Sequence, residues 1–208
     1  MVEWAVLASE RVSMSSGPLA QAGREIYCLR MRTAIFDTAL GLFGICWTDA
    51  GLARVLLPGD EEVTIRERLE RSGGTQGHMD RTISALMDRI EDYADSVAVD
   101  FSDTRLDLGG VPAFHRRAYD MLLLVGWGRT LTYGDLARQL GDVGLSRAVG
   151  QAMGANPVPL VVPCHRVLAS SGRPGGFSAP GGPLSKMKML ALEGVHVGAP
   201  AGQMTFGF

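Results

Sequence analysis

The sequence predicts an α+β fold: an N-terminal antiparallel sheet with helices, joined to a mostly helical C-terminal part that carries a helix-turn-helix of winged-helix-like form. Three observations predict this fold. Runs of β-branched and aromatic residues come early in the chain, helical spacing of apolar residues follows them, and the second half contains two short helical segments around a glycine-bearing turn. The Gly/Pro stretch at 107–112 separates the halves and marks a domain boundary.

This boundary divides the chain into three predicted units: a loosely ordered tail over residues 1–28, an N-terminal α+β domain over 29–111 and a C-terminal domain over 112–208. The tail has no clear hydrophobic period and contains a turn-like run of Ser, Gly and Pro. A strand-like pattern begins where the tail ends, and it marks the start of the N-terminal domain.

The N-terminal domain combines strands with two helices. Aliphatic, aromatic and β-branched runs predict strands over 27–36, 41–48 and 52–57. Helical spacing predicts helices over 64–71 and 82–94, with a polar, glycine-containing loop between them. The second helix has one apolar face, formed by Ile83, Leu86, Met87, Ile90 and Tyr93.

The C-terminal domain begins with a helix predicted over Phe114–Val125. Thr132 is expected to cap a second helix that runs to about Leu140, and Asp135 completes a capping-box-like pair with it. After a turn at 141–144 a third, shorter helix follows, so the outline is that of a helix-turn-helix.

The third helix is predicted over Arg147–Met153, with Ser146 as its cap. It is rich in small residues, and its two glycines, Gly150 and Gly154, each cost about 1 kcal/mol relative to alanine. Close packing against another helix and close approach to a partner surface both explain that cost.

Composition excludes several classes of protein. The chain is 46% hydrophobic and 20% charged, as in ordinary globular proteins, and no apolar stretch approaches the roughly 18 residues of a membrane span. The N-terminus lacks the basic start of a secretory signal. Three cysteines are too few for a disulfide framework, and no Cys/His spacing resembles a metal-ligand set. A cytoplasmic protein without a metal is expected.

Charge is distributed unevenly around a net value of −2. Residues 112–196 carry nine Lys and Arg against four Asp and Glu, whereas residues 33–111 carry seven against fifteen. A basic second half points to a polyanionic partner for that half alone. A chance division of solvated charges is the alternative.

The stretch 158–167, Val-Pro-Leu-Val-Val-Pro-Cys-His-Arg-Val, carries the chemistry. Prolines stiffen the approach to Cys164, and His165 follows it directly. A thiol attacks only as a thiolate, so a neighbouring base makes Cys164 a candidate nucleophile. The alternative is a buried structural cysteine, which is the interpretation for Cys28 and Cys46 because neither has such a neighbour.

These motifs resemble the O6-alkylguanine-DNA alkyltransferases, also called methylated-DNA–protein-cysteine methyltransferases. The resemblance covers most of residues 112–195, and weaker similarity lies around Asp37-Thr38. It rests on the order and spacing of four motifs: Thr132-Tyr133-Gly134, Arg147-Ala-Val-Gly followed by Asn156-Pro157-Val158-Pro159, Pro163-Cys164-His165-Arg166-Val167, and Leu190–Gly194.

The resemblance implies a repair protein that moves a methyl or other alkyl group from O6-alkylguanine in DNA to Cys164, with O4-alkylthymine as a second candidate substrate. His165 is then the base, acting through a water, and Glu193 the carboxylate that orients it. Asn156 fixes the turn and forms hydrogen bonds near the thiol. The transfer needs no cofactor and occurs once per molecule.

The resemblance also implies how DNA is bound. The third helix enters the minor groove of duplex DNA, which suits the small residues Ala148, Gly150, Ala152 and Gly154. Arg147 fills the space of the damaged nucleotide after it flips out. Tyr133 crowds the 3′ phosphate and donates to the base. The family resemblance and the compact size suggest a monomer.

A lid over the flipped base is implied at Phe177 and Ser178, where phenylalanine replaces the more usual tyrosine. The segment 178–185 departs from the family pattern because it is slightly longer and carries two prolines. Lys186 and Lys188 are candidates for phosphate contacts, or belong to a solvated helix face.

Three other interpretations compete with this one. A damage binder of the same fold lacks the cysteine, which is present here. A helix-turn-helix transcription factor needs Arg, Asn or Gln on its third helix to contact base edges, and this helix has one Gln and mostly small residues. A cysteine hydrolase needs an oxyanion-binding motif, and no glycine-based one is found.

Overall fold

The computed structural model describes residues 31–197. The predicted tail and the last residues of the predicted C-terminal domain lie outside this range. The first part of the described chain forms a four-stranded sheet in the order β3-β2-β1-β4. Its elements are β1 (Arg32–Phe36), β2 (Phe43–Thr48), β3 (Gly51–Leu56), α2 (Glu62–Arg71), β4 (Thr75–Gln76) and α3 (Arg81–Ala94).

The sheet is mixed, which corrects the predicted antiparallel arrangement. β1–β2 and β2–β3 pair antiparallel as expected, but the short strand β4 pairs parallel to β1. Helix α2 lies between β3 and β4 in the sequence and packs on β1 and β2, and the chain leaves it to pair beside β1. The two-residue strand β4 fell in the region predicted as a polar loop.

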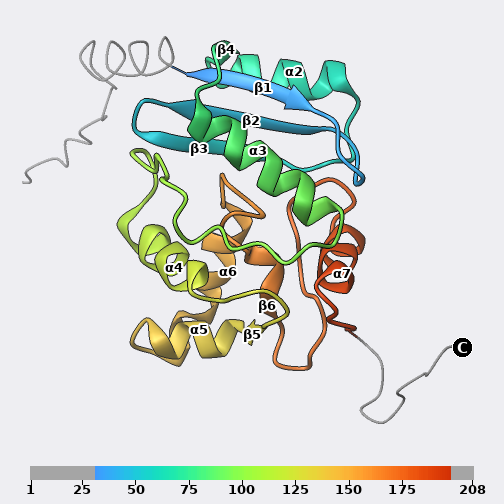
Figure 1. Cartoon of the computed structure of the whole chain (residues 1–208). Coiled ribbons are helices and arrows are strands. Elements are labelled where there is room, and N and C mark those ends of the chain that lie inside the picture. The colour runs from blue at the N-terminus through green and yellow to red at the C-terminus, as the bar shows by residue number, and fades with distance from the viewer. Residues whose placement is uncertain (1–30, 198–208) are drawn as a thin grey trace, which may run out of the picture.

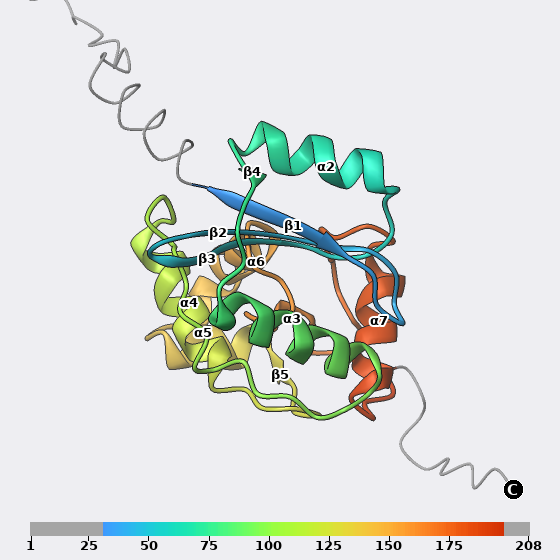
Figure 2. The ribbon, with the colours of Figure 1, turned by 45° about the horizontal axis from the view of Figure 1, so that its top comes forward.

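Helices α2 and α3 cover opposite faces of this sheet (Figure 2). Strand β2 is buried along its whole length for that reason. Phe43, Ile45 and Trp47 alternate toward the main core, whereas Cys46 packs in a smaller cluster beneath α2. Gly44 lies under α2, where a Cβ atom would come 2.7 Å from Ile65, so the close approach of the helix requires glycine.

Helix α3 buries the face that the sequence predicted. Asp80 caps its start by accepting a hydrogen bond from the backbone N–H of Ile83 at 3.0 Å. Near the end of the helix, Tyr93 is fully buried and points toward the C-terminal half of the molecule. The helix therefore packs on both the sheet and the C-terminal part, between which it lies in Figure 1.

The C-terminal part is mostly helical, as predicted. Helices α5 and α6 pack together and form the expected helix-turn-helix. The elements of this part are α4 (Ala113–Leu123), β5 (Leu131–Thr132), α5 (Tyr133–Gln139), η1 (Val143–Leu145), α6 (Ser146–Gly154), η2 (Cys164–Arg166), β6 (Val167–Leu168) and α7 (Pro183–Leu192).

Helices α5 and α6 begin in different ways, and the sequence predicts only the first of these caps correctly. The capping box of α5 is confirmed, because Thr132 Oγ1 accepts from the Asp135 N–H at 3.1 Å and Asp135 Oδ2 accepts from the Thr132 N–H at 2.9 Å. The predicted Ser146 cap is wrong. The 3-10 turn η1 runs directly into α6, so Ser146 is already helical and its hydroxyl donates backward to the Val143 carbonyl at 2.7 Å.

The two halves share one hydrophobic core. The main cluster of buried residues runs without interruption from Phe43 on the sheet to Val149 on α6 and Met189 on α7. A backbone hydrogen bond also crosses between them, from the N–H of Val55 on β3 to the carbonyl of Pro157 at 2.9 Å. Within residues 31–197, no helix is both long and apolar enough to cross a membrane.

Candidate active site

Cys164 begins the 3-10 turn η2, at the end of a tight loop that follows α6. Leu160 in this loop has a φ of +77°, a conformation that a branched side chain adopts at a cost in free energy. Asn156 holds the loop together: its Nδ2 donates to the Val162 carbonyl at 2.9 Å, and its Oδ1 accepts from the Val158 N–H at 3.1 Å. The loop thus fixes the backbone on which the thiol is carried.

A cavity of about 420 Å³ opens onto Cys164. The residues that line it come from α5, α6, η2 and the loop before α7: Tyr133, Gly150, Met153, Gly154, Cys164, Gly176, Phe177 and Ser178. The structure therefore brings together the predicted acceptor, both predicted lid residues and the predicted tyrosine. Cys164 itself is only 4% exposed.

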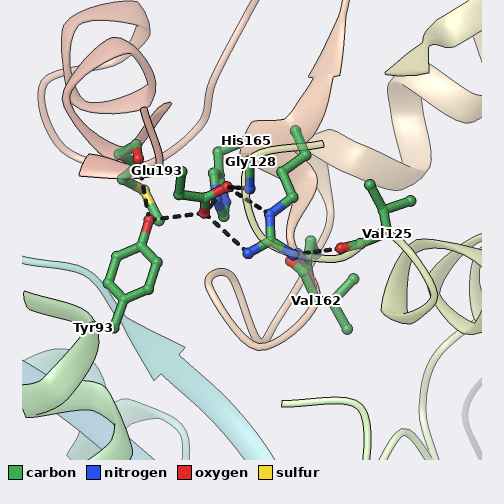
Figure 3. A network of polar contacts seen from close by, with 9 residues as sticks. Tyr93, Val125, Gly128, Val162, His165 and Glu193 are labelled. Carbon is green, nitrogen blue, oxygen red and sulfur yellow. Dashed lines mark hydrogen bonds and ion pairs between the residues drawn. The ribbon is translucent and has the colours of Figure 1, made fainter. Parts of the chain in front are cut away.

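His165, which directly follows Cys164 in the chain, belongs to a buried polar network that is drawn in Figure 3. His165 Nε2 lies 2.6 Å from Oε1 of Glu193, which ends helix α7. Arg166 donates to the same carboxylate from Nε at 2.9 Å and from Nη2 at 3.0 Å, and its Nη1 donates to the Val125 carbonyl. The predicted His–Glu pair is present, and the arginine beside it completes a buried ion pair.

Glu193 accepts two further hydrogen bonds. The Tyr93 hydroxyl donates to Oε1 at 3.2 Å, and the backbone N–H of Gly128 donates to Oε2 at 3.2 Å. Burial alone would raise the pKa of Glu193, but the hydrogen bonds from His165 and Arg166 outweigh it and lower that pKa to about 2. The carboxylate is therefore ionised, and it is not the solvated helix-end group that its position in the sequence allowed.

His165 is held as a neutral base. Its Nε2 faces the carboxylate, so Nε2 carries the hydrogen and Nδ1 is left as the acceptor. Nδ1 is buried and has no hydrogen-bond partner among the described residues. Burial lowers the pKa of His165 against the opposing effect of Glu193, so the imidazole is unprotonated near neutral pH.

Burial has the opposite effect on the thiol. It raises the pKa of Cys164, while the Asn156 side chain and the charge of Lys186 act to lower it. The thiol is therefore protonated at rest and needs a base to become a nucleophile. A neutral imidazole on the residue that follows a protonated thiol fits general-base activation of that thiol.

Lys186 corrects a prediction. The sequence placed it on a solvated helix face or near phosphates, but it is fully buried, and its Nζ donates to the Val167 carbonyl at 2.5 Å. Nζ also lies 5.8 Å from the centre of the Tyr133 ring. Burial lowers the pKa of Lys186 to about 8, and the charge of Cys164 opposes that change. Lys188, two residues on, is exposed as expected.

The predicted DNA-facing residues of α6 divide into two groups. Arg147 is exposed and Ala148 is half-buried. Gly150 and Gly154 face open space, since a Cβ atom on either would meet nothing within 4 Å. Ala152 is fully buried in the core, which removes its side chain from the predicted DNA-facing set. Packing within the protein thus does not explain the two glycines.

Sequence reasoning missed three members of the buried network. Arg166 stands in the Pro-Cys-His-Arg motif, which by itself predicts no partner for it, and Gly128 carries no signal because only its backbone takes part. The helical pattern predicts Tyr93 on an apolar face and gives no partner for its hydroxyl. Its distance of 100 residues from Glu193 explains the omission, because no local pattern connects them.

The similarity to known proteins decides among the competing interpretations. Residues 113–195 match the model of the 6-O-methylguanine DNA methyltransferase DNA-binding domain. A methylated-DNA–protein-cysteine methyltransferase of Methanothermobacter thermautotrophicus is 35% identical over 155 residues, which cover 74% of this chain and 80% of that protein. One of Mycolicibacterium paratuberculosis is also 35% identical, covering 71% and 90%. The chain belongs to the methylated-DNA–protein-cysteine methyltransferase family.

Solved structures agree with this membership. Mycobacterium tuberculosis OGT in complex with DNA is similar over 78% of this chain and 93% of its own, with a TM-score of 0.64 and 29% identity. The O6-methylguanine-DNA methyltransferase of Pyrococcus kodakaraensis has a TM-score of 0.59 and 26% identity, covering 79% and 99%. Membership of this family means that the protein binds DNA and removes alkyl groups from O6-alkylguanine. The function predicted from the sequence is therefore confirmed.

Proposed function

We propose that Cys164 is the residue that accepts the alkyl group. The observation that carries this assignment is that Cys164 lines an open cavity and directly precedes His165, whose imidazole is paired with the buried Glu193 carboxylate. Cys46, by contrast, is fully buried in β2 beneath α2 and lies outside the residues that line this cavity. Cys28, for which a structural role was predicted, lies outside the described residues.

The reaction begins with removal of the thiol proton. His165 accepts it at Nδ1 through one bridging water, and Glu193 stabilises the imidazolium that forms, since its carboxylate stays ionised. Arg166 fixes the carboxylate with two hydrogen bonds, so the pair needs no rearrangement when the proton arrives.

The transfer itself is an in-line displacement. The S–C bond forms as the bond between the alkyl carbon and O6 breaks, the electron pair of that bond passes to guanine, and guanine gains one proton in place of the one lost by the thiol. Tyr133 and Ser178 line the cavity and supply hydroxyl donors to the base. Burial raises the pKa of Tyr133, so its phenol keeps the proton that a donor needs. The thioether product is not reversed, and each molecule reacts once without a cofactor.

The substrate reaches Cys164 by rotating out of the duplex. Because Cys164 is buried at the inner end of the cavity, O6 of a stacked guanine is out of its reach. Gly150 and Gly154 leave the outer face of α6 without side chains, which suits insertion into the narrow minor groove. Arg147, exposed at the start of α6, fills the vacated space. The protein acts as a monomer in the cytoplasm, where the thiol stays reduced.

Intact-protein mass spectrometry followed by peptide mapping tests the acceptor. After mixing with excess duplex that contains O6-methylguanine, we expect one added methyl group per protein, on Cys164. Cys164→Ala should gain none while still binding the duplex. A methyl group on another residue, or several per protein, contradicts the assignment.

A further inference from the structure

Tyr93 connects the N-terminal half of the protein to the buried network. It lies near the end of α3, is fully buried, and its ring packs edge-on against Trp127 at 5.4 Å and against His165 at 6.3 Å between ring centroids. The ring is thus fixed from two sides, which holds the hydroxyl oxygen within reach of Glu193. Figure 3 shows it directed at Glu193.

The phenol donates to the carboxylate oxygen that also holds the base. Its hydroxyl lies 3.2 Å from Oε1 of Glu193 and 3.4 Å from the carbonyl oxygen of Met189. Oε1 also faces His165 Nε2 at 2.6 Å and Arg166 Nη2 at 3.0 Å. Three donors share one oxygen, which offers about two lone pairs, so each competes with the others for its negative charge.

We propose that Tyr93 is a positioning residue for alkyl transfer, whose hydroxyl sets how strongly Oε1 of Glu193 holds the imidazole of His165. This inference rests on the proposed role of His165 as the base. It adds to the reaction a side chain from the N-terminal half, outside the matched region 113–195.

The expected direction of the effect follows from electrostatics. Without the phenol, Oε1 carries more charge toward Nε2, and the imidazolium form of His165 becomes more stable. The pKa of His165 then rises from its lowered value, and a higher pH is needed before the imidazole can accept the thiol proton. A stronger phenol donor has the opposite effect.

Other charges around His165 do not blur this measurement. Lys186 loses its charge near its pKa of about 8, on the alkaline side of the profile. Glu193 is ionised down to about pH 2. The titratable and charged groups that surround His165 are Glu193, Arg166, Lys186, Tyr93 and the Cys164 thiol.

The test is the pH dependence of the single-turnover rate with free O6-benzylguanine, which removes DNA binding from the measurement. For Tyr93→Phe in the full chain we expect the acidic limb of the profile to move up by about half a pH unit, which lowers the rate on that limb about threefold. Replacement of Tyr93 by 3-fluorotyrosine, a stronger donor of nearly the same shape, should move the limb down.

Tyr119→Phe is the matched control. It removes another fully buried phenol, whose hydroxyl donates to the Ala152 carbonyl at 2.7 Å and not to the carboxylate. Its profile should keep the wild-type position whatever stability it loses. If Tyr93→Phe does not fold, the 3-fluorotyrosine protein alone still tests the proposal.

The outcomes separate the two proposals. Opposite shifts for the two Tyr93 proteins, with none for Tyr119→Phe, support the positioning role. If the wild type has an acidic limb and neither Tyr93 protein shifts it, the positioning role of Tyr93 is overturned. The base role of His165 then stays intact. A wild-type profile without an acidic limb removes the base role, and the role of Tyr93 with it.

Discussion

The cavity that Cys164 lines and the buried polar network that begins at His165 are built in opposite ways. On the cavity side, Gly150, Gly154 and Gly176 leave open space, since a Cβ atom on any of them would meet nothing within 4 Å. On the inner side, both oxygens of Glu193 are occupied by hydrogen bonds, and His165 is fully buried. The cavity is open because glycines leave out side chains, whereas the network consists of polar side chains that hydrogen-bond to one another.

This difference shows that the protein is preorganised in the buried network and not in the cavity. The groups proposed to activate the thiol already form their hydrogen bonds without substrate, which would avoid reorganisation during the reaction. The cavity side, which is proposed to receive DNA, offers space that a flipped nucleotide would fill. Substitutions should therefore affect chemistry on the inner side and access on the cavity side.

The largest effect is expected from Glu193→Gln. The change leaves the Arg166 cation buried without its carboxylate, which costs about 3–5 kcal/mol of unfolding free energy, and weakens the base, which lowers the transfer rate about 100-fold or more. Urea unfolding and single-turnover rates near neutral pH measure the two losses. Glu91→Gln, an exposed carboxylate on α3, should change neither.

The same variant has a distinct pH dependence. The pKa of Glu193 lies at about 2, below its ordinary value of 4.5, so its contribution to stability is present above pH 4.5 and is lost as the pH falls toward 2. Glu193→Gln should lack this part of the acid-induced loss. Equal slopes of stability against pH for both proteins in this window would contradict the assigned pKa.

A smaller effect is expected on the cavity side from Gly150→Leu. The open space around this residue and the poor helix propensity of glycine predict a protein that is more stable by up to about 1 kcal/mol. The new side chain should nevertheless slow transfer from duplex DNA about 10- to 100-fold, because it occupies the surface that approaches the groove. Melting temperature and single-turnover rates test both statements.

Gly110→Leu is the matched control, since Gly110 also faces open space but lies before α4, away from the cavity. It should leave transfer unchanged. If Gly150→Leu repairs duplex DNA at the wild-type rate, the outer face of α6 is not the surface that meets DNA.

Of these three substitutions, Arg147→Ala should have the smallest effect and the most selective one. If Arg147 fills the space of the flipped nucleotide, its loss should lower the rate with duplex about tenfold, while the rate with free O6-benzylguanine stays within about twofold. Comparison of the two substrates under single-turnover conditions measures the split. Equal losses of rate with both substrates would remove the base-flipping role of Arg147. Arg105→Ala, at an exposed position in the N-terminal half, controls for the loss of a surface charge.

Local patterns predicted most of the fold. The apolar face of α3, the capping box of α5 and the helix-turn-helix follow from spacings within a few residues, and each is found in the structure. The errors lie where a neighbour in space overrides the local pattern. Ser146 cannot cap α6 because η1 leads into the helix without a break, and β4 pairs parallel because α2 returns the chain beside β1.

The sequence by itself determined the family and the candidate nucleophile, because the Pro-Cys-His-Arg motif and the motifs around it are contiguous or regularly spaced. Only the tertiary structure decided the environment of those groups. The α3 tyrosine that meets Glu193, the ion pair that Arg166 adds, and the burial of Lys186 all depend on which elements pack together. Burial and proximity across distant segments set the charge states of the site, and no local pattern of residues encodes them.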